Sequence, residues 1–350
     1  FKVFAAGGLS TRPYYAKPVM DFIPLEDALP MCRAIVGLHR EHGDRKNRAR
    51  ARLKFVMADW GEEKFIAELT KLFEKYRAEA SPDFAERILR ENEENRRREE
   101  ELVRAKFPND PPREWKDFRP LSVFRQRQSG LYGVVARVPR GETSPDQLRA
   151  LARLARQYGD HCLHLTIRQN VEFHFLTAEE VRSVVDELAR IGFPCDQPDG
   201  ILDVVSCTGA DYCRLAVTTS MSMAAHLIAE MEDFPPESPA RRLRINISGC
   251  PNSCAQQQIV DIGLMGVLTK VDGEQLEAYN IFLGGDAERA FFGKLFDKKL
   301  LPEQVVAKVN ALAHIYNEEA QNGECFLDYL DRVGFDPLRE RISTRIAAGA

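Results

Sequence analysis

Two closely spaced pairs of cysteines are the residues of this sequence best suited to chemistry. Cys207 and Cys213 bound the stretch CTGADYC, and Cys250 and Cys254 bound the stretch CPNSC. Four thiolates suit a [4Fe–4S] cluster, with one thiolate for each iron. A structural zinc site usually separates paired ligands by two to four residues, a spacing that the first pair exceeds. The sequence therefore favours a cluster, with a zinc site or unligated core cysteines as the open alternatives.

The residues around the two pairs are typical of tight turns. Pro251 has a fixed φ and no N–H donor, while Gly209 and Gly249 allow the backbone to approach a bulky group. We expect both loops to lead into helices, whose N-terminal N–H groups favour an anionic ligand. The other cysteines are scattered singly, which predicts small buried hydrophobic side chains: Cys32, Cys162, Cys195 and Cys325.

Cationic and amide side chains gather in three other segments. In RRLRINIS, Arg244 and Asn246 share one face of a predicted strand. That face suits a multiply anionic ligand, and a solvent-exposed strand face is the alternative. Arg168 interrupts the alternating segment LTIRQNVEFHF, as part of a turn or of a polar cofactor wall. Arg52 and Lys54 close the run NRARARLKF and point the same way if that run is a strand.

Composition excludes several classes of partner. The 350-residue chain has a net charge of −4, which does not suggest a nucleic-acid binder. No apolar run reaches the roughly 18 residues of a membrane helix, and the N-terminus lacks the ordered regions of a secretory signal. We therefore expect a cytoplasmic protein with neither nucleic acid nor membrane as a partner.

An internal repeat organises the chain. FKVFAAGGLS at the start is similar to YNIFLGGDAE at 279–288, since alternating apolar residues lead into a Gly-Gly turn in both. An amphipathic helix is predicted after each, and then a second helix, GEEKFIAELTKL in the first copy and GECFLDYLDRV in the second. About 150 residues precede the second Gly-Gly element and almost none precede the first. The pattern predicts an α+β fold that contains the end of one repeat and the whole of another, with the beginning of the first copy missing.

Four segments follow from this pattern. Residues 1–80 form the end of the first repeat, and residues 81–128 form a charged linker with a solvated helix. Residues 129–200 show a β-α-β-α order that is typical of a ferredoxin-like module. Residues 201–346 carry both cysteine pairs and form the predicted cofactor-binding domain.

The cysteine segments CTGADYC and NISGCPNSCAQQQIVDIGLMG resemble those of the siroheme-dependent nitrite and sulfite reductases. LYGVVARVPRGETSPDQLRALARLARQYGD and LTIRQNVEFHF resemble the ferredoxin-like module of that family. The resemblance implies a pseudo-two-fold repeat of ferredoxin-like and siroheme/[4Fe–4S]-binding parts. It also implies that Cys254 bridges the cluster to siroheme iron and that Asn252 lies against the cofactor. The other three cluster ligands would be Cys207, Cys213 and Cys250.

The reaction implied by the resemblance is the six-electron reduction of nitrite to ammonia or of sulfite to sulfide. Electrons would come from a ferredoxin or a flavoprotein. Most anion-binding cations of this family belong to the first half, so we assign no catalytic residue here and do not expect this chain alone to reduce either anion. The candidate cofactor contacts are Arg168, Arg244, Asn246, Asn252, Arg52 and Lys54. A cluster-only electron-transfer protein without siroheme is the alternative function, and a zinc-stapled structural protein is a third.

Overall fold

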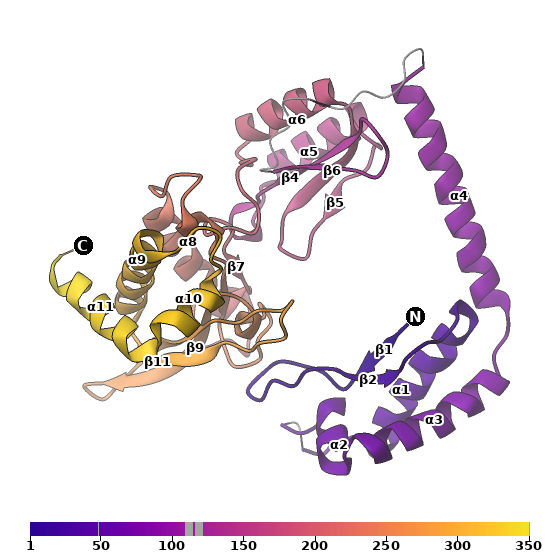
Figure 1. The fold of residues 1–350 in the computed structure, drawn as a ribbon, viewed down its shortest axis with the longest axis horizontal. Helices are drawn as coiled ribbons and strands as arrows, with labels where there is room; N and C mark the ends of the chain where they lie inside the picture. The colour runs from indigo at the N-terminus through magenta and orange to yellow at the C-terminus, as the bar shows by residue number, and fades with distance from the viewer. Residues whose placement is uncertain (48, 109–114, 116–121, 350) are drawn as a thin grey trace. The chain divides into compact units, whose positions relative to one another are not determined.

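The computed structural model describes residues 1–47, 49–108, 115 and 122–349. The chain divides into an N-terminal unit, residues 1–101, and a C-terminal unit, residues 102–350; Figure 1 shows the elements of both. The division falls inside the predicted linker, and most of residues 109–121 of that linker lie outside the described residues. The four predicted segment boundaries stay predictions.

The N-terminal unit combines a two-stranded antiparallel sheet with helices. Its core contains Leu38, Phe65 and Phe73, all almost fully buried. Its elements are β1 (Val3–Ala5), β2 (Lys17–Met20), α1 (Ala28–His42), α2 (Leu53–Trp60), α3 (Glu62–Ala78) and the larger part of α4 (Asp83–Lys106).

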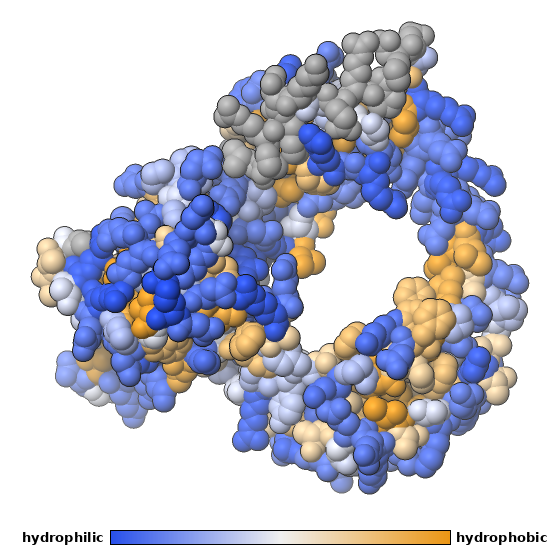
Figure 2. Space-filling model, in the orientation of Figure 1, coloured by the Kyte–Doolittle hydropathy of each residue, from blue (hydrophilic) through white to orange (hydrophobic). Residues whose placement is uncertain are grey.

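Helix α4 confirms the solvated helix predicted in the linker. Its sequence is almost wholly charged, and Ala85 is its buried residue. Most of the helix is hydrophilic in Figure 2. A helix with so little apolar surface gains little from packing, so its stability must come mainly from propensity and from charge pairs such as Arg87–Glu91.

The first part of the C-terminal unit is a four-stranded sheet in the order β3-β4-β6-β5. Helices α5 and α6 pack their apolar faces on it, and the shared core includes Phe173, Leu151 and Val184. Both helices begin with a capping box, at Ser144 and at Thr177. The elements are β3 (Val123–Arg125), β4 (Tyr132–Ala136), α5 (Pro145–Gln157), β5 (His164–Leu165), β6 (Val171–Leu176) and α6 (Ala178–Arg190).

The second part is a five-stranded sheet in the order β11-β10-β9-β8-β7. Strands β7, β8 and β9 are parallel, and β9, β10 and β11 are antiparallel. Buried apolar residues of β8 and β9, such as Ile245 and Leu264, share one core with α8 and α9. The elements are β7 (Val205–Ser206), α7 (Gly209–Tyr212), α8 (Ser220–Met231), β8 (Ile245–Ser248), β9 (Ile262–Val271), β10 (Glu274–Leu283), β11 (Lys294–Leu300), α9 (Pro302–Glu319), α10 (Phe326–Val333) and α11 (Phe335–Ala347).

The predicted repeat is present, with one correction to its alignment. The N-terminal copy runs from β1 to α3 and the C-terminal copy from β10 to α11, and each has two antiparallel strands followed by three helices. A glycine in the same conformation separates the last two helices, Gly61 (φ 81°, ψ 162°) and Gly334 (φ 78°, ψ 159°). GEEKFIAELTKL therefore corresponds to α11 rather than to α10. The segment GECFLDYLDRV, which contains α10, corresponds instead to α2.

Candidate functional site

Both cysteine loops leave the same edge of the five-stranded sheet. Strands β7 and β8 are parallel, with Val205 opposite Asn246 and Ser206 opposite Ile247. Cys207 follows β7 directly, and its N–H donates to the carbonyl of Ile247 over 3.0 Å. The carboxyl ends of parallel strands meet at one edge, which is where ligands bind in open sheets of this kind. The two predicted cysteine pairs therefore lie on neighbouring loops.

Two glycines let these loops touch each other. A Cβ atom on Gly249 would lie 3.2 Å from the Cα of Gly209 and 2.9 Å from the carbonyl oxygen of Thr218. Gly209 itself has a φ of 63°, which disfavours other residues. The sequence analysis expected these glycines to admit a bulky group. In the structure, they admit the backbone of the neighbouring loop.

The four thiols differ in exposure. Cys250 is buried, Cys207 and Cys213 are half-buried, and Cys254 is exposed. The N–H of Gly249 donates to the Sγ of Cys207 over 3.1 Å. Hydrogen bonds to ligating sulfur atoms are one of the factors that set the potential of an iron–sulfur cluster.

The spacing of the sulfur atoms bears on the choice between zinc and a cluster. In a tetrahedral zinc site with Zn–S bonds of about 2.3 Å, the sulfur atoms lie about 3.8 Å apart. Among the described residues, no three of the four sulfur atoms lie within 4.8 Å of one another. A four-iron cluster holds its thiolates farther apart than a single ion does, because each thiolate binds a different iron. The described sulfur atoms therefore do not form a preformed tetrahedral zinc site, and the choice of the cluster stays a prediction.

Unpartnered buried polar atoms surround the loops. They are the Oγ of Ser206, the Oδ1 of Asn246 and both amide atoms of Gln257, which have no hydrogen-bond partner among the described residues. Buried polar atoms in native proteins are usually satisfied by protein, water or a bound group. These donors and acceptors, beside four thiols, fit a site that holds a polar cofactor. Asn246 is buried, so the alternative of a solvent-exposed strand face is wrong for this residue.

Each of the two predicted arginines already has a carboxylate partner. Arg168 is in the turn between β5 and β6, where its Nε lies 2.6 Å from Asp199 and 3.2 Å from Asp203. The Nε of Arg244 donates to Asp261 over 3.2 Å. These three aspartates could not be predicted from the sequence, because they are far from the arginines along the chain.

Burial and mutual attraction both affect the pKa values of Arg244 and Asp261. Burial acts to lower the pKa of Arg244, and nearby aspartates, Asp261 foremost, raise it above its ordinary value. Burial raises the pKa of Asp261, against the opposing effect of Arg244. Arg244 therefore stays charged directly before β8.

The other candidate residues are placed differently. Asn252 is exposed at the tip of the second cysteine loop. Lys54 is buried in α2, where its Nζ donates to the carbonyls of Gly8, Leu9 and Arg12. Arg52 precedes that helix, so the strand considered for NRARARLKF is wrong. A role for Arg52 and Lys54 toward a cofactor stays a prediction.

The scattered cysteines do not all match the prediction of buried side chains. Cys32 is exposed, while Cys162, Cys195 and Cys325 are half-buried. Burial raises the pKa of Cys195 to about 12, so its thiol stays protonated at neutral pH. The prediction is wrong for Cys32, which lies on the outer face of α1.

Models of two protein families match the chain. The nitrite and sulphite reductase 4Fe–4S domain matches residues 1–76 and 198–348, which is more than half of the chain, and the nitrite/sulfite reductase ferredoxin-like half domain matches residues 124–191. The chain belongs to the nitrite and sulfite reductase family. The predicted family resemblance and α+β repeat are thereby confirmed, and the family carries a [4Fe–4S] cluster and siroheme.

Curated relatives and solved structures agree with the family. The ferredoxin–nitrite reductase of Synechococcus elongatus is 31% identical over 81% of this chain and 50% of its own length. Sulfite reductase [ferredoxin] 1 of Mycolicibacterium paratuberculosis is 28% identical over 96% of this chain and 57% of its own length. The structure of the Mycobacterium tuberculosis NirA protein shares the fold, with a TM-score of 0.73 and 24% identity over 97% of this chain and 58% of that chain. The chain thus spans about half the length of the curated relatives it matches.

Proposed function

We propose that this chain carries the cluster-binding part of an enzyme that reduces nitrite to ammonia or sulfite to sulfide. The observation that carries the proposal is the meeting of the two cysteine loops at the carboxyl ends of β7 and β8 in a member of this family. Cys207, Cys213, Cys250 and Cys254 would ligate the [4Fe–4S] cluster, and Cys254 would bridge it to siroheme iron. When bound, the cluster and siroheme supply the one-electron steps of the six-electron reduction.

The chain's own residues hold and shape this site. Cys250 is buried at the start of the second loop, while Cys254 and Asn252 are exposed, where a second group can reach them. The contact between Gly209 and Gly249 keeps the loops together. These features support a rigid edge on which two cofactors can lie in contact.

Arg168, Arg244 and Asn246 would contact the carboxylates and polar edge of siroheme. Among the described residues, Arg168 uses Nε and Nη2 in its contacts and Arg244 uses Nε, so each guanidinium keeps N–H donors for another anion. Their aspartate partners orient them and would offset part of their charge. We assign no catalytic acid within this chain.

The proposed partners are nitrite or sulfite and a ferredoxin or flavoprotein donor. The two relatives described above are named for ferredoxin, which supports that type of donor. Within the described residues, no helix is both long and apolar enough to cross a membrane. The cytoplasmic location and the absence of a nucleic-acid partner stay predictions.

The cluster assignment is tested by exchanging single cysteines. The chain is reconstituted anaerobically with iron and sulfide, and about four irons per chain are expected. Cys254→Ser should remove most of the cluster absorbance, whereas the matched control Cys325→Ser should keep it. Equal iron content in the two variants would contradict the assignment.

The siroheme assignment has its own readout. The chain is purified from cells that make siroheme, and its Soret and red-region absorbance are measured alongside the reduction of nitrite and sulfite with a chemical electron donor. A Soret band that is lost in Cys254→Ser supports the proposal. Cluster absorbance without any haem spectrum would favour the cluster-only electron-transfer protein.

A further inference from the structure

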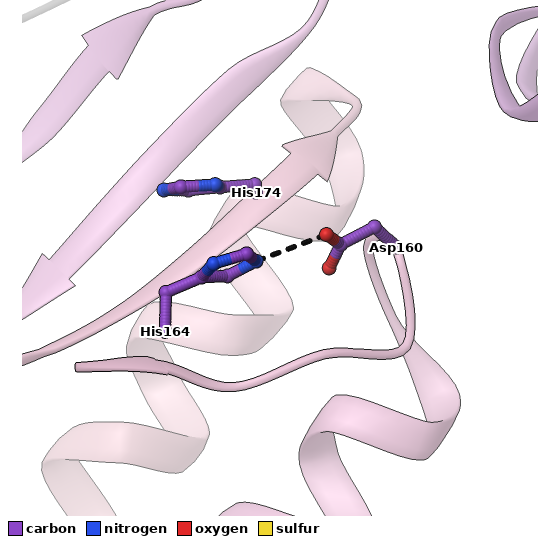
Figure 3. A group of neighbouring side chains, drawn as sticks. All are labelled: Asp160, His164 and His174. Carbon is purple, nitrogen blue, oxygen red and sulfur yellow. Dashed lines mark hydrogen bonds and ion pairs between the residues drawn. The ribbon is translucent and has the colours of Figure 1, made fainter. Parts of the chain in front are cut away.

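A second group of potential metal ligands lies in the four-stranded sheet, apart from the cysteine loops. Asp160, His164 and His174 lie together there, with one ligand atom of each within 4.8 Å of the others. Figure 3 shows the two imidazole rings stacked above each other and the carboxylate of Asp160 directed at His164. This is the one such group of three found among the described residues. The proposed function does not use these residues.

The fold places the three side chains through a sheet register and a tight turn. Antiparallel pairing of β5 and β6 sets His164 opposite Glu172. His174 lies two residues farther along β6, on the same face as Glu172 and opposite to the buried Phe173. Asp160 comes from the turn after α5. This turn passes so close to β6 that a Cβ on Gly159 would lie 2.3 Å from the carbonyl oxygen of His174.

Hydrogen bonds fix the orientation of the group. The Nε2 of His164 lies 2.9 Å from the Oδ2 of Asp160, whose Oδ1 accepts the N–H of Cys162 over 3.1 Å. The Nε2 of His174 lies 2.9 Å from the Oε2 of Glu172. The two rings are stacked with centroids 4.0 Å apart and planes 19° apart.

Two partly buried carboxylates flank the imidazole pair. Asp160 and Glu172 have 12% and 27% of their side chains exposed. Asp160 contacts the ring of His164, and Glu172 contacts the ring of His174. A carboxylate and two imidazole nitrogens in this arrangement form a set of donors for a divalent cation.

We propose that Asp160, His164 and His174 bind one divalent transition-metal ion of the zinc class. Two imidazole nitrogens and one carboxylate suit such borderline ions, whereas Mg²⁺ and Ca²⁺ prefer oxygen ligands. Glu172 orients His174 through the second ring nitrogen, as carboxylates commonly do for metal-binding histidines. Ligand atoms around a tetrahedral zinc lie about 3.3 Å apart, so binding draws the three side chains together.

An ion here would stiffen the hairpin that reaches the first cysteine loop. The turn between β5 and β6 contacts the cysteine-bearing part through Asn170, which donates to Asp203, and through Gln169, which donates to the carbonyl of Ser206. Ser206 directly precedes Cys207. The proposed role of the ion is therefore structural, at the base of a hairpin whose tip supports the cluster loop.

Cobalt titration of the whole chain tests this site without an activity assay. Co²⁺ is added anaerobically to the wild-type chain after its cysteine loops are loaded with the cluster, and in the same way to His164→Ala, to His174→Ala and to the matched control His161→Ala, an exposed histidine in the same loop. One equivalent should bind the wild type and the control with visible d–d absorbance and no thiolate-to-cobalt charge-transfer band. Each of the other two variants should bind at least about tenfold more weakly. Zn²⁺ should displace the cobalt, and Mg²⁺ should not.

Two results would overturn the proposal. One is the absence of this nitrogen- and oxygen-ligated cobalt spectrum in the wild-type chain, a result that does not depend on how any variant folds. The other is unchanged binding in His164→Ala. Asp160→Asn, which keeps the size of the side chain, provides a second variant, and circular dichroism verifies that each variant is folded. Zn²⁺ should also raise the melting temperature of the wild type and of His161→Ala, and should leave that of the weak-binding variants unchanged.

Discussion

The N-terminal and C-terminal copies of the repeat share their element order but differ in what adjoins their strands. In the C-terminal copy, β10 pairs with β9, so the strand pair continues into the sheet that carries both cysteine loops. In the described residues, β1 and β2 form a sheet of two strands, with Phe4 and Phe22 exposed nearby. The candidate site therefore depends on the parallel strands β7 and β8 and not on the repeated motif itself.

A second difference concerns how the second helix of each copy meets the Gly-Gly turn. Counted back from Gly61 and Gly334, Lys54 and Leu327 occupy the same position. Lys54 reaches the turn with an ammonium group that binds backbone carbonyls, whereas the side chain of Leu327 packs beside Gly284. The same position in the repeat thus makes a polar contact in the N-terminal copy, through Lys54, and an apolar contact in the C-terminal copy, through Leu327.

The largest expected effect on bound iron comes from separating the cysteine loops. Gly249→Ala places a Cβ against Thr218 and Gly209, and such overpacking costs about 1–3 kcal/mol, so bound cluster iron should fall about tenfold or more. Gly293→Ala, a glycine with only ordinary contacts, is the control and should keep its iron. Full iron content in Gly249→Ala would mean that the close contact is not needed.

The next effect tests the buried lysine of the N-terminal copy. Lys54→Met leaves three carbonyls without their donor and should destabilise the copy by about 2–5 kcal/mol. Hydrogen exchange of peptides from residues 8–20 and α2 measures this locally. Leu327→Met at the matching position should cost less than about 1.5 kcal/mol. Equal losses in the two copies would remove the distinction between them.

The two interhelical glycines should respond alike. Gly61 and Gly334 share a conformation that only glycine adopts easily, and a Cβ would meet no close neighbour at either position. Gly61→Ala and Gly334→Ala should therefore each cost about 1–3 kcal/mol through backbone strain alone. Denaturant unfolding followed by hydrogen exchange gives both values. A cost confined to one position would argue against structural equivalence.

The smallest effect is a pH response of the C-terminal copy. His314 lies in α9 and packs against Phe234. Burial lowers the pKa of His314, and the positive charge of Arg345 lowers it further. Below pH 6.5 the unfolded chain therefore binds this proton more readily than the folded chain, so stability should fall as the pH drops through that value. Denaturant melts between pH 7.5 and 5.5 should show a shallower slope for His314→Gln. An identical slope would exclude this histidine as a source of the response.

Much of the fold was predictable because its signals are local. Capping residues around Thr177, the charged run of α4 and the alternation of β6 each depend on residues close in sequence. The repeat was also visible, but the pairing of its helices was not. The pairing of the helices is decided by the shared backbone conformation of Gly61 and Gly334, which the sequence does not reveal.

The cysteine spacing by itself favoured an iron–sulfur cluster and left a zinc site and unligated core cysteines as open alternatives. Only the tertiary structure decided how the two loops meet, because the parallel pairing of β7 and β8 joins residues about 40 positions apart. The same holds for the aspartates beside Arg168 and Arg244, and for the grouping of Asp160, His164 and His174. Residue type sets what a side chain can bind, but chain topology sets which side chains can bind together.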